Sequence, residues 1–187
     1  FLFLIGLLSD LKRFNNVSLR FFLQLIFIFL FIQILQLEIN NTKIAIIDNI
    51  LKNNYMNMIF VLFCLMILVN GSNFIDGING LLIGYYIVVI FVLILKFDQG
   101  FNTNSHFLIN LMPILLIIYI LNIKGLIYMG DSGAYLLSLF VGIYLIQFSY
   151  FNSHISPYLI IVLLWYPCFE LLFSMIRRNQ KKNKKYK

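Results

Sequence analysis

The sequence predicts an all-α membrane protein, a polytopic bundle of about six full transmembrane helices and part of a seventh. Apolar residues make up 61% of the 187 residues and charged residues only 11%. A soluble domain is nearer about half apolar and about a quarter charged. The mean hydropathy of +0.93 agrees with this comparison. A lipid bilayer can cover so much apolar surface, whereas the core of a soluble protein cannot.

The helices are predicted from the lengths of the apolar runs, because a helix needs about 20 apolar residues to cross a bilayer. Residues 1–8 read as the last turns of one helix, and residues 44–51 as a short interfacial segment. The six predicted spans are 19–37, 56–70, 79–95, 107–122, 132–148 and 157–176. The chain opens with Phe1 in a helical run and without Met, so we expect it to be a fragment.

The distribution of basic residues predicts the orientation of the helices. Counting crossings places the segments 9–18, 71–78, 123–131 and 177–187 on one side of the membrane. That side holds 11 of the 14 Lys and Arg, namely Lys12, Arg13, the helix-edge Arg20, Lys124 and the seven after residue 176. The positive-inside rule therefore predicts that this side faces the cytoplasm.

The basic C-terminus divides the chain into a membrane domain, residues 1–176, and a basic cytoplasmic tail, residues 177–187. Its last nine residues, rich in Lys and Asn, suggest a disordered or truncated loop. A basic tail after an apolar run differs from the folded basic surface of a nucleic-acid-binding protein. We expect a membrane anchor and no nucleic-acid partner.

Three acidic residues stand in three separate segments of the predicted cytoplasmic side. Asp10, Asp76 and Asp131 each lie beside a Gly or another small residue, near a predicted helix end. Three carboxylates that meet on one face could hold a hard cation together with a phosphate. The plainer alternative is that each Asp only caps a helix.

The most specific motif is N-G-S-N-F-I-D-G-I-N-G-L-L, residues 70–82. Asn70, Asn73, Asp76 and Asn79 recur every third residue, so they could share one face of a helix or tight turn. A lipid-facing helix would not carry four such residues, because each costs free energy to desolvate. An ordinary polar turn explains one Asn and one Gly, but not the whole run.

Three further stretches carry polar residues near predicted helix ends. In Y-M-G-D-S-G-A-Y-L, residues 128–136, Gly130 and Asp131 open a span whose N–H groups could hold a metal-bridged phosphate. In G-L-L-S-D-L-K-R-F, residues 6–14, Asp10 precedes Lys12. In Y-P-C-F-E-L-L-F-S-M-I-R-R, residues 166–178, Glu170 is either a functional intramembrane carboxylate or a structural residue paired with a neighbour.

In this order, the motifs resemble those of the polyprenyl-phosphate N-acetylhexosamine-1-phosphate transferase superfamily, glycosyltransferase family 4. The stretches around Asp76 and Asp131 resemble its two best-known cytoplasmic signatures, and residues 6–12 resemble its aspartate-pair motif. The segment 167–178 resembles a stretch of the polysaccharide branch. Members of this superfamily start peptidoglycan lipid, teichoic acid, O-antigen and capsule synthesis.

The resemblance implies a phosphotransferase in the bacterial inner membrane with its active site facing the cytoplasm. The donor would be a UDP-sugar, typically UDP-N-acetylhexosamine, and the acceptor a polyprenyl phosphate such as undecaprenyl phosphate, within membrane lipid. Mg²⁺ would be required, with Mn²⁺ as a replacement. The products would be polyprenyl-diphosphate-sugar and UMP. The oligomeric state is left open, a homodimer included.

Residue roles follow from the same resemblance. Asp131 would ligate Mg²⁺, and Asp10 would help to bind the metal or the lipid phosphate. Asp76 with Asn70 would orient the nucleotide diphosphate or act in phosphate activation. The substrate-binding residues would be Asn70, Asn73, Asn79, Lys12, Gly130, Arg177 and Arg178.

One departure from the family pattern concerns the aspartate pair, because Ser9 stands where the first Asp is usual. Two alternatives remain beside the transferase, and the first follows from Ser9. One is a catalytically inactive relic, which would bind substrates without turnover. The other is a transporter that holds an ion between Asp and Asn inside the membrane, with Asp76 and Asp131 near the bilayer midplane on broken helices.

Overall fold

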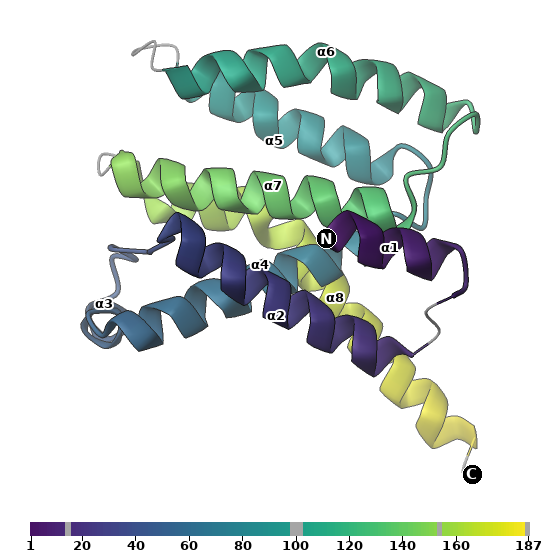
Figure 1. Cartoon of the computed structure of the whole chain (residues 1–187), viewed down its shortest axis with the longest axis horizontal. Helices are drawn as coiled ribbons and strands as arrows, with labels where there is room; N and C mark the ends of the chain where they lie inside the picture. Colours follow the sequence, from purple (N-terminus) through teal and green to yellow (C-terminus); the bar gives the residue numbers. More distant parts are fainter. Residues whose placement is uncertain (14–15, 98–102, 153–154, 186–187) are drawn as a thin grey trace. The chain divides into compact units, whose positions relative to one another are not determined.

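A computed structural model describes residues 1–13, 16–97, 103–152 and 155–185, apart from the side chains of residues 96–97, 103–106 and 181–185. Every regular element in these residues is an α-helix, as the composition predicts (Figure 1). The helices are α1 Leu2–Asp10, α2 Val17–Leu35, α3 Ala45–Leu51, α4 Asn54–Ile75, α5 Leu81–Phe97, α6 Thr103–Ile123, α7 Gly130–Phe151 and α8 Pro157–Lys185. The all-α prediction is confirmed.

Each of the six predicted spans coincides with one helix. These helices are α2, α4, α5, α6, α7 and α8. Within the described residues, four helices are long and apolar enough to cross a membrane: Val17–Leu35, Asn54–Ile75, Gly130–Phe151 and Pro157–Gln180. The remaining two contain shorter apolar segments, Leu81–Leu95 and Phe107–Ile123. The chain is therefore a multi-pass helical membrane protein.

Two predicted helix ends differ from the structure by five residues or more. Helix α4 continues to Ile75, so the predicted loop 71–78 is wrong for its first five residues. The polar side chains do not break this helix, because the Asn70 side chain donates to the Met66 carbonyl one turn back, 2.9 Å away. Helix α8 continues to Lys185, where the composition predicts a disordered end. Lys, Arg and Gln favour helix, and cations stabilise a helix C-terminus.

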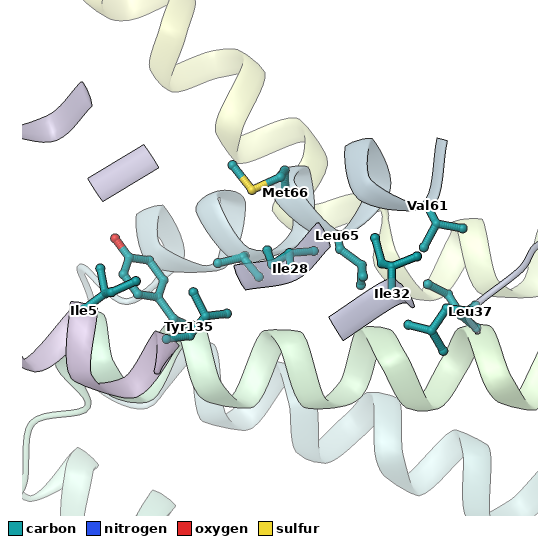
Figure 2. Close-up of a cluster of buried hydrophobic side chains, with 11 residues drawn as sticks. Ile5, Ile28, Ile32, Leu37, Val61, Leu65, Met66 and Tyr135 are labelled. Carbon is teal, nitrogen blue, oxygen red and sulfur yellow. The ribbon is translucent and has the colours of Figure 1, made fainter. Parts of the chain in front are cut away.

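The chain divides into two compact units, residues 1–74 with 130–187 (unit 1) and residues 75–129 (unit 2). The core of unit 1 gathers buried residues from α1, α2, α4 and α7. Figure 2 shows Ile28 and Ile32 of α2 beside Val61 and Leu65 of α4, with Tyr135 of α7 at one end of the cluster. Tyr135 therefore has an aliphatic surrounding, while its hydroxyl points away from the cluster.

Polar side chains fix both ends of α2. The Asn16 side chain caps its start by accepting from the backbone N–H groups of Ser18 and Leu19. The helix ends at Gln36, whose φ of 48° lies in the left-handed region. Beyond this end, buried Asn57 of α4 exchanges hydrogen bonds with the backbone of Ile39. These contacts position Arg20 and Gln24 near the start of α2.

In unit 2, helices α5 and α6 lie side by side (Figure 1). Gly84 of α5 faces the Tyr119 ring of α6, where a Cβ atom would lie 2.9 Å from Tyr119 Cε2. The absence of a side chain at Gly84 thus lets the two helices approach closely. The turn between α4 and α5 holds the second half of the N-G-S-N-F-I-D-G-I-N-G motif.

Candidate active site at the start of helix α7

Asp10 of α1 caps the start of α7 from outside that helix. Its carboxylate accepts from the backbone N–H groups of Asp131 and Ser132, at 2.9 and 3.2 Å, and from the Ser132 hydroxyl at 3.0 Å. The first N–H groups of a helix have no partner inside the helix, and the helix dipole favours a negative charge there. Asp10 therefore satisfies two backbone donors that would otherwise face water or a bound anion.

Two glycines allow this close approach between α1 and α7, which pack together (Figure 1). A Cβ atom at Gly6 would lie 2.3 Å from the Ser132 Cα atom. At Gly130, φ is 63°, and a Cβ atom would lie 2.6 Å from Asp10 Oδ2. Both positions require glycine, since a side chain would separate the Asp10 carboxylate from the N–H groups that it caps.

The Asp131 carboxylate is held by two side chains from other helices. Arg20 of α2 donates to Asp131 Oδ2 at 2.8 Å, and the Ser9 hydroxyl donates to the same oxygen at 2.5 Å. Arg20 also donates to Ser9. Ser9 stands where the resemblance implies an acid. Its hydroxyl thus acts as a hydrogen-bond bridge between the Arg20 cation and the Asp131 anion.

A second polar layer lies one helical turn further along α2 and α7. Gln24 follows Arg20 by four residues, Tyr135 follows Asp131 by four, and both side chains are buried. Asn73 Nδ2 of α4 donates to the Tyr135 hydroxyl at 3.4 Å. This hydrogen bond connects α4 with α7, one turn along α7 from the Arg20–Asp131 pair.

The end of α4 contacts α8 through the same motif. Gly71 lies against the Pro167 backbone, where a Cβ atom would be 2.2 Å from the carbonyl oxygen. One turn later, the Arg178 guanidinium lies 4.9 Å from the centre of the Phe74 ring, a cation–π contact. The predicted residues Asn73 and Arg178 are thus both positioned by the last turn of α4.

Glu170 pairs within its own helix. Arg177 Nη2 donates to Glu170 Oε1 at 2.5 Å and to the Ser174 hydroxyl at 3.0 Å, while Ser174 donates to the same Glu170 oxygen. The ion pair with Arg177 favours the structural interpretation of Glu170. The partner lies two turns away on α8, instead of on a neighbouring helix.

In unit 2, Asp76 and Asn79 lie in the turn that follows α4. The buried Asn122 side chain of α6 fixes this turn, because its Oδ1 accepts from the Gly80 backbone N–H and its Nδ2 donates to the Ile127 carbonyl. Gly80 has φ of 82° and no space for a Cβ atom, which would lie 2.7 Å from Ile123 Cγ1. The motif turn is therefore held from α6.

The structure brings together part of the predicted site. Asp10, Gly130 and Asp131 meet directly, and Asn73 bonds Tyr135, one turn along α7 from Asp131. Asn70 bonds its own helix, whereas Lys12 is exposed just after α1, with φ of 54°. Arg177 and Arg178 belong to α8 in unit 1, and Asp76 and Asn79 belong to unit 2.

Four contributing residues are absent from the sequence-based site: Arg20, Gln24, Tyr135 and Asn122. A signal for the first two exists, because Arg20 and Gln24 are four residues apart in the stretch 19–35, where Gln33 is the only other polar residue. Tyr135 and Asn122 carry no such signal, since a Tyr and an Asn near the end of a span are common in membrane helices.

The carboxylate and hydroxyl oxygens at the start of α7 are the hard donors that Mg²⁺ prefers. Among the described residues, no group of three or more His, Cys, Asp or Glu could hold a metal ion. Asp10 and Asp131 therefore suit a cation that takes one or two protein carboxylates and completes its shell with phosphate and water, as Mg²⁺ does.

The comparisons with known proteins identify the family. The model of glycosyl transferase family 4 matches residues 1–149, which is most of the chain and includes α1 to α6 and nearly all of α7. A search of curated proteins and a search of solved structures each found no match. The chain therefore belongs to glycosyl transferase family 4, a family of membrane enzymes that transfer sugar phosphates to polyprenyl phosphate.

Proposed function

We propose that this protein transfers sugar-1-phosphate from a UDP-sugar, a UDP-N-acetylhexosamine, to polyprenyl phosphate in the bacterial inner membrane. A phosphate oxygen of the polyprenyl phosphate attacks the phosphorus that bears the sugar. The bond between that phosphorus and the UMP oxygen breaks, which gives polyprenyl-diphosphate-sugar and UMP. This reaction would initiate cell-envelope polysaccharide synthesis from the cytoplasmic face.

The observation that carries this proposal is the meeting of Asp10, Asp131 and Arg20 where α1 ends and α2 and α7 begin. At the ends of apolar helices, a phosphate on a lipid chain and a water-soluble nucleotide can reach the same residues. Both substrates are polyanions, so the reaction needs cationic groups that balance their charge. Arg20, which contacts Asp131, supports this requirement, and Lys12 and Arg178 are further cations within the sequence motifs.

Mg²⁺, when bound to Asp131 and Asp10, would supply charge neutralisation at the transferred phosphoryl group. Arg20 would hold Asp131 in place while its guanidinium balances negative charge, and Ser9 would orient the same carboxylate. Asp76 and Asn70 would orient the nucleotide. Arg177 and Arg178 would bind substrate phosphate at the end of α8.

The location of the acids favours a transferase over a transporter. A transporter site predicts Asp76 and Asp131 in broken helices near the bilayer midplane. In the structure, Asp131 lies in the first turn of α7, and Asp76 lies just after the last residue of α4. Carboxylates at helix ends suit chemistry at the membrane surface.

The test is UMP release by the full-length protein in detergent, with UDP-N-acetylglucosamine, undecaprenyl phosphate and Mg²⁺. Wild type should release UMP, and Asp131→Asn should not. Asp48→Asn is a matched control, because Asp48 lies in α3, beyond the opposite end of α2 from Arg20. If a panel of UDP-sugars gives no UMP with wild type, the proposal is wrong and an inactive relic becomes the better description.

A further inference from the structure

Arg20 reaches Asp131 through one nitrogen and one oxygen. Arg20 Nη1 donates to Asp131 Oδ2 at 2.8 Å, and the same nitrogen donates to the Ser9 hydroxyl. An arginine fork often binds a carboxylate through two parallel hydrogen bonds, which is the stronger arrangement. Arg20 Nε is buried without a hydrogen-bond partner among the described residues, and such a donor costs free energy. The pair therefore holds Asp131 at a single point and leaves part of the guanidinium unsatisfied.

The charges at this pair do not cancel. Asp10 and Asp131 carry one negative charge each, Arg20 carries one positive charge and Ser9 is neutral, so the four residues have a formal net charge of −1. Within the part of the chain that the structure describes, Arg20 is the cation that forms an ion pair with Asp131. Without Arg20, the two carboxylates would present a charge of −2, which matches a divalent cation.

A divalent cation bound to Asp131 would oppose the contact with Arg20. Two cations at one carboxylate repel each other, and the repulsion is strong where the dielectric constant is low. The Arg20 and Asp131 side chains are only 20% and 25% exposed, so water and salt screen this repulsion less than at an open surface. Mg²⁺ also needs carboxylate oxygens that are free to enter its octahedral shell, whereas Asp131 Oδ2 already accepts from Arg20 and Ser9.

We infer that Arg20 and a divalent cation are alternative partners of Asp131: Arg20 holds the carboxylate in place before the metal binds and leaves it when the metal arrives. This inference rests on the proposed function, because Mg²⁺ is the ion that the proposed reaction uses. A guanidinium released from Asp131 stays at the start of α2, and its planar fork suits a phosphate. Arg20 would then balance the charge of a substrate phosphate once the metal has bound.

The experiment measures Mg²⁺ binding without turnover. The probe is MgCl₂, which replaces NaCl at constant ionic strength, and the readout is the rise of the thermal unfolding midpoint of the full-length protein in detergent. Arg20→Met removes the competing charge and should bind Mg²⁺ about 10-fold more tightly than wild type. Arg20→Lys keeps the charge, and a single-point contact does not need the fork, so its affinity should lie nearer to that of wild type. A purely structural role of Arg20 predicts unchanged or weaker Mg²⁺ binding in Arg20→Met, and that result would overturn the inference.

Two controls locate the effect at Asp131. Lys12→Met removes an exposed cation just after α1, and it should leave the Mg²⁺ affinity within about 2-fold of wild type, because water and salt screen an exposed charge. The double variant Arg20→Met with Asp131→Asn removes the acid as well and should lose most of the response to Mg²⁺. The inference would be overturned by equal tightening in Lys12→Met and Arg20→Met, by an undiminished response in the double variant, or by no response to Mg²⁺ in Arg20→Met.

Because the readout is metal binding, the inference and the proposed function can fail separately. Tighter Mg²⁺ binding in Arg20→Met, without UMP release by wild type from any donor, would support the exchange at Asp131 and count against the proposed function alone. UMP release by wild type, with equal Mg²⁺ affinity in wild type and Arg20→Met, would overturn the inference and leave the proposed function in place.

Discussion

The backbone N–H of Asp131 donates to the side chain of Asp10, 2.9 Å away, so one acidic residue of the candidate site supports the other. The two carboxylates therefore differ in role. Asp10 is engaged with backbone donors of α7, whereas Asp131 is engaged with Arg20 and Ser9. Of the two roles that the sequence leaves open for each acid, capping is the one that Asp10 performs, and metal binding by Asp131 stays a prediction.

Asp10→Asn and Asp10→Ala should separate these roles. Asn caps helices about as well as Asp, so Asp10→Asn should keep the unfolding midpoint near that of wild type. Asp10→Ala removes the cap and should cost about 1 kcal/mol of unfolding free energy. UMP release should fall strongly in both, because the negative charge is lost in both. Full activity in Asp10→Asn would show that Asp10 is a cap and no more.

The Arg20–Asp131 pair is partly buried, with side chains 20% and 25% exposed, so it is screened less than a surface ion pair. Arg20→Met leaves the Asp131 carboxylate without its cation and should cost about 2–3 kcal/mol of unfolding free energy. Denaturant unfolding in detergent measures this loss.

The double variant Arg20→Met with Asp131→Asn is the control for that experiment. It removes both charges, so it should recover most of the stability lost in Arg20→Met and still release no UMP. Equal destabilisation in the single and double variants would mean that Arg20 stabilises the fold through packing and not through Asp131.

Much of the helical architecture can be predicted from the sequence, because the length of an apolar run directly sets whether a helix can span a bilayer. Crossing parity also predicts that the segments holding Asp10 and Asp131 share one side, and in unit 1 they do lie together. The end of α4 could not be predicted in this way. Residues 71–75 are predicted as loop, but they stay helical beside the Asn70 bond to the Met66 carbonyl and the contact of Gly71 with Pro167.

The partners within the site could not be predicted, because they depend on contacts between residues far apart in the chain. Arg20 and Asp131 are separated by 111 residues. In the sequence, Arg20 counts only as a basic residue at a helix edge, and Ser9 only as a departure from a family pattern. Their meeting at one carboxylate oxygen emerges from the packing of α1 and α2 against α7.

Close helix contacts at glycine give a prediction about stability. Gly6→Ala and Gly71→Ala should each cost about 1–3 kcal/mol, because the new Cβ would meet backbone atoms of Ser132 and Pro167 at 2.3 and 2.2 Å. Gly142→Ala is the matched control. Its Cβ would meet only the side-chain ends of Leu65 and Leu68, at 2.7 and 2.8 Å, and these can rotate away. Three similar unfolding midpoints would contradict the prediction.

The loop before α3 gives a prediction about pH. Asp48 accepts from the Thr42 hydroxyl and the Thr42 backbone N–H, both at 2.7 Å, and these hydrogen bonds hold the pKa of the Asp48 carboxyl below its ordinary value. A carboxyl whose pKa is lower in the folded protein stabilises the fold above the unfolded-state pKa, about 3.9, and loses this contribution as the pH falls through the folded-state pKa. Wild type should therefore lose stability relative to Asp48→Asn as the pH falls from about 5 to about 3.

The direction of that effect is tested with Thr42→Val, which removes the hydroxyl and leaves the backbone N–H in place. The pH dependence of its unfolding midpoint should lie between those of wild type and Asp48→Asn, because the hydroxyl is the largest cause of the lowered pKa and the N–H the next. Because Asp48 is only partly buried, the effect should be small and should be measured as a difference between matched variants at each pH. Parallel curves for all three proteins would show that the Thr42 contacts do not persist in solution.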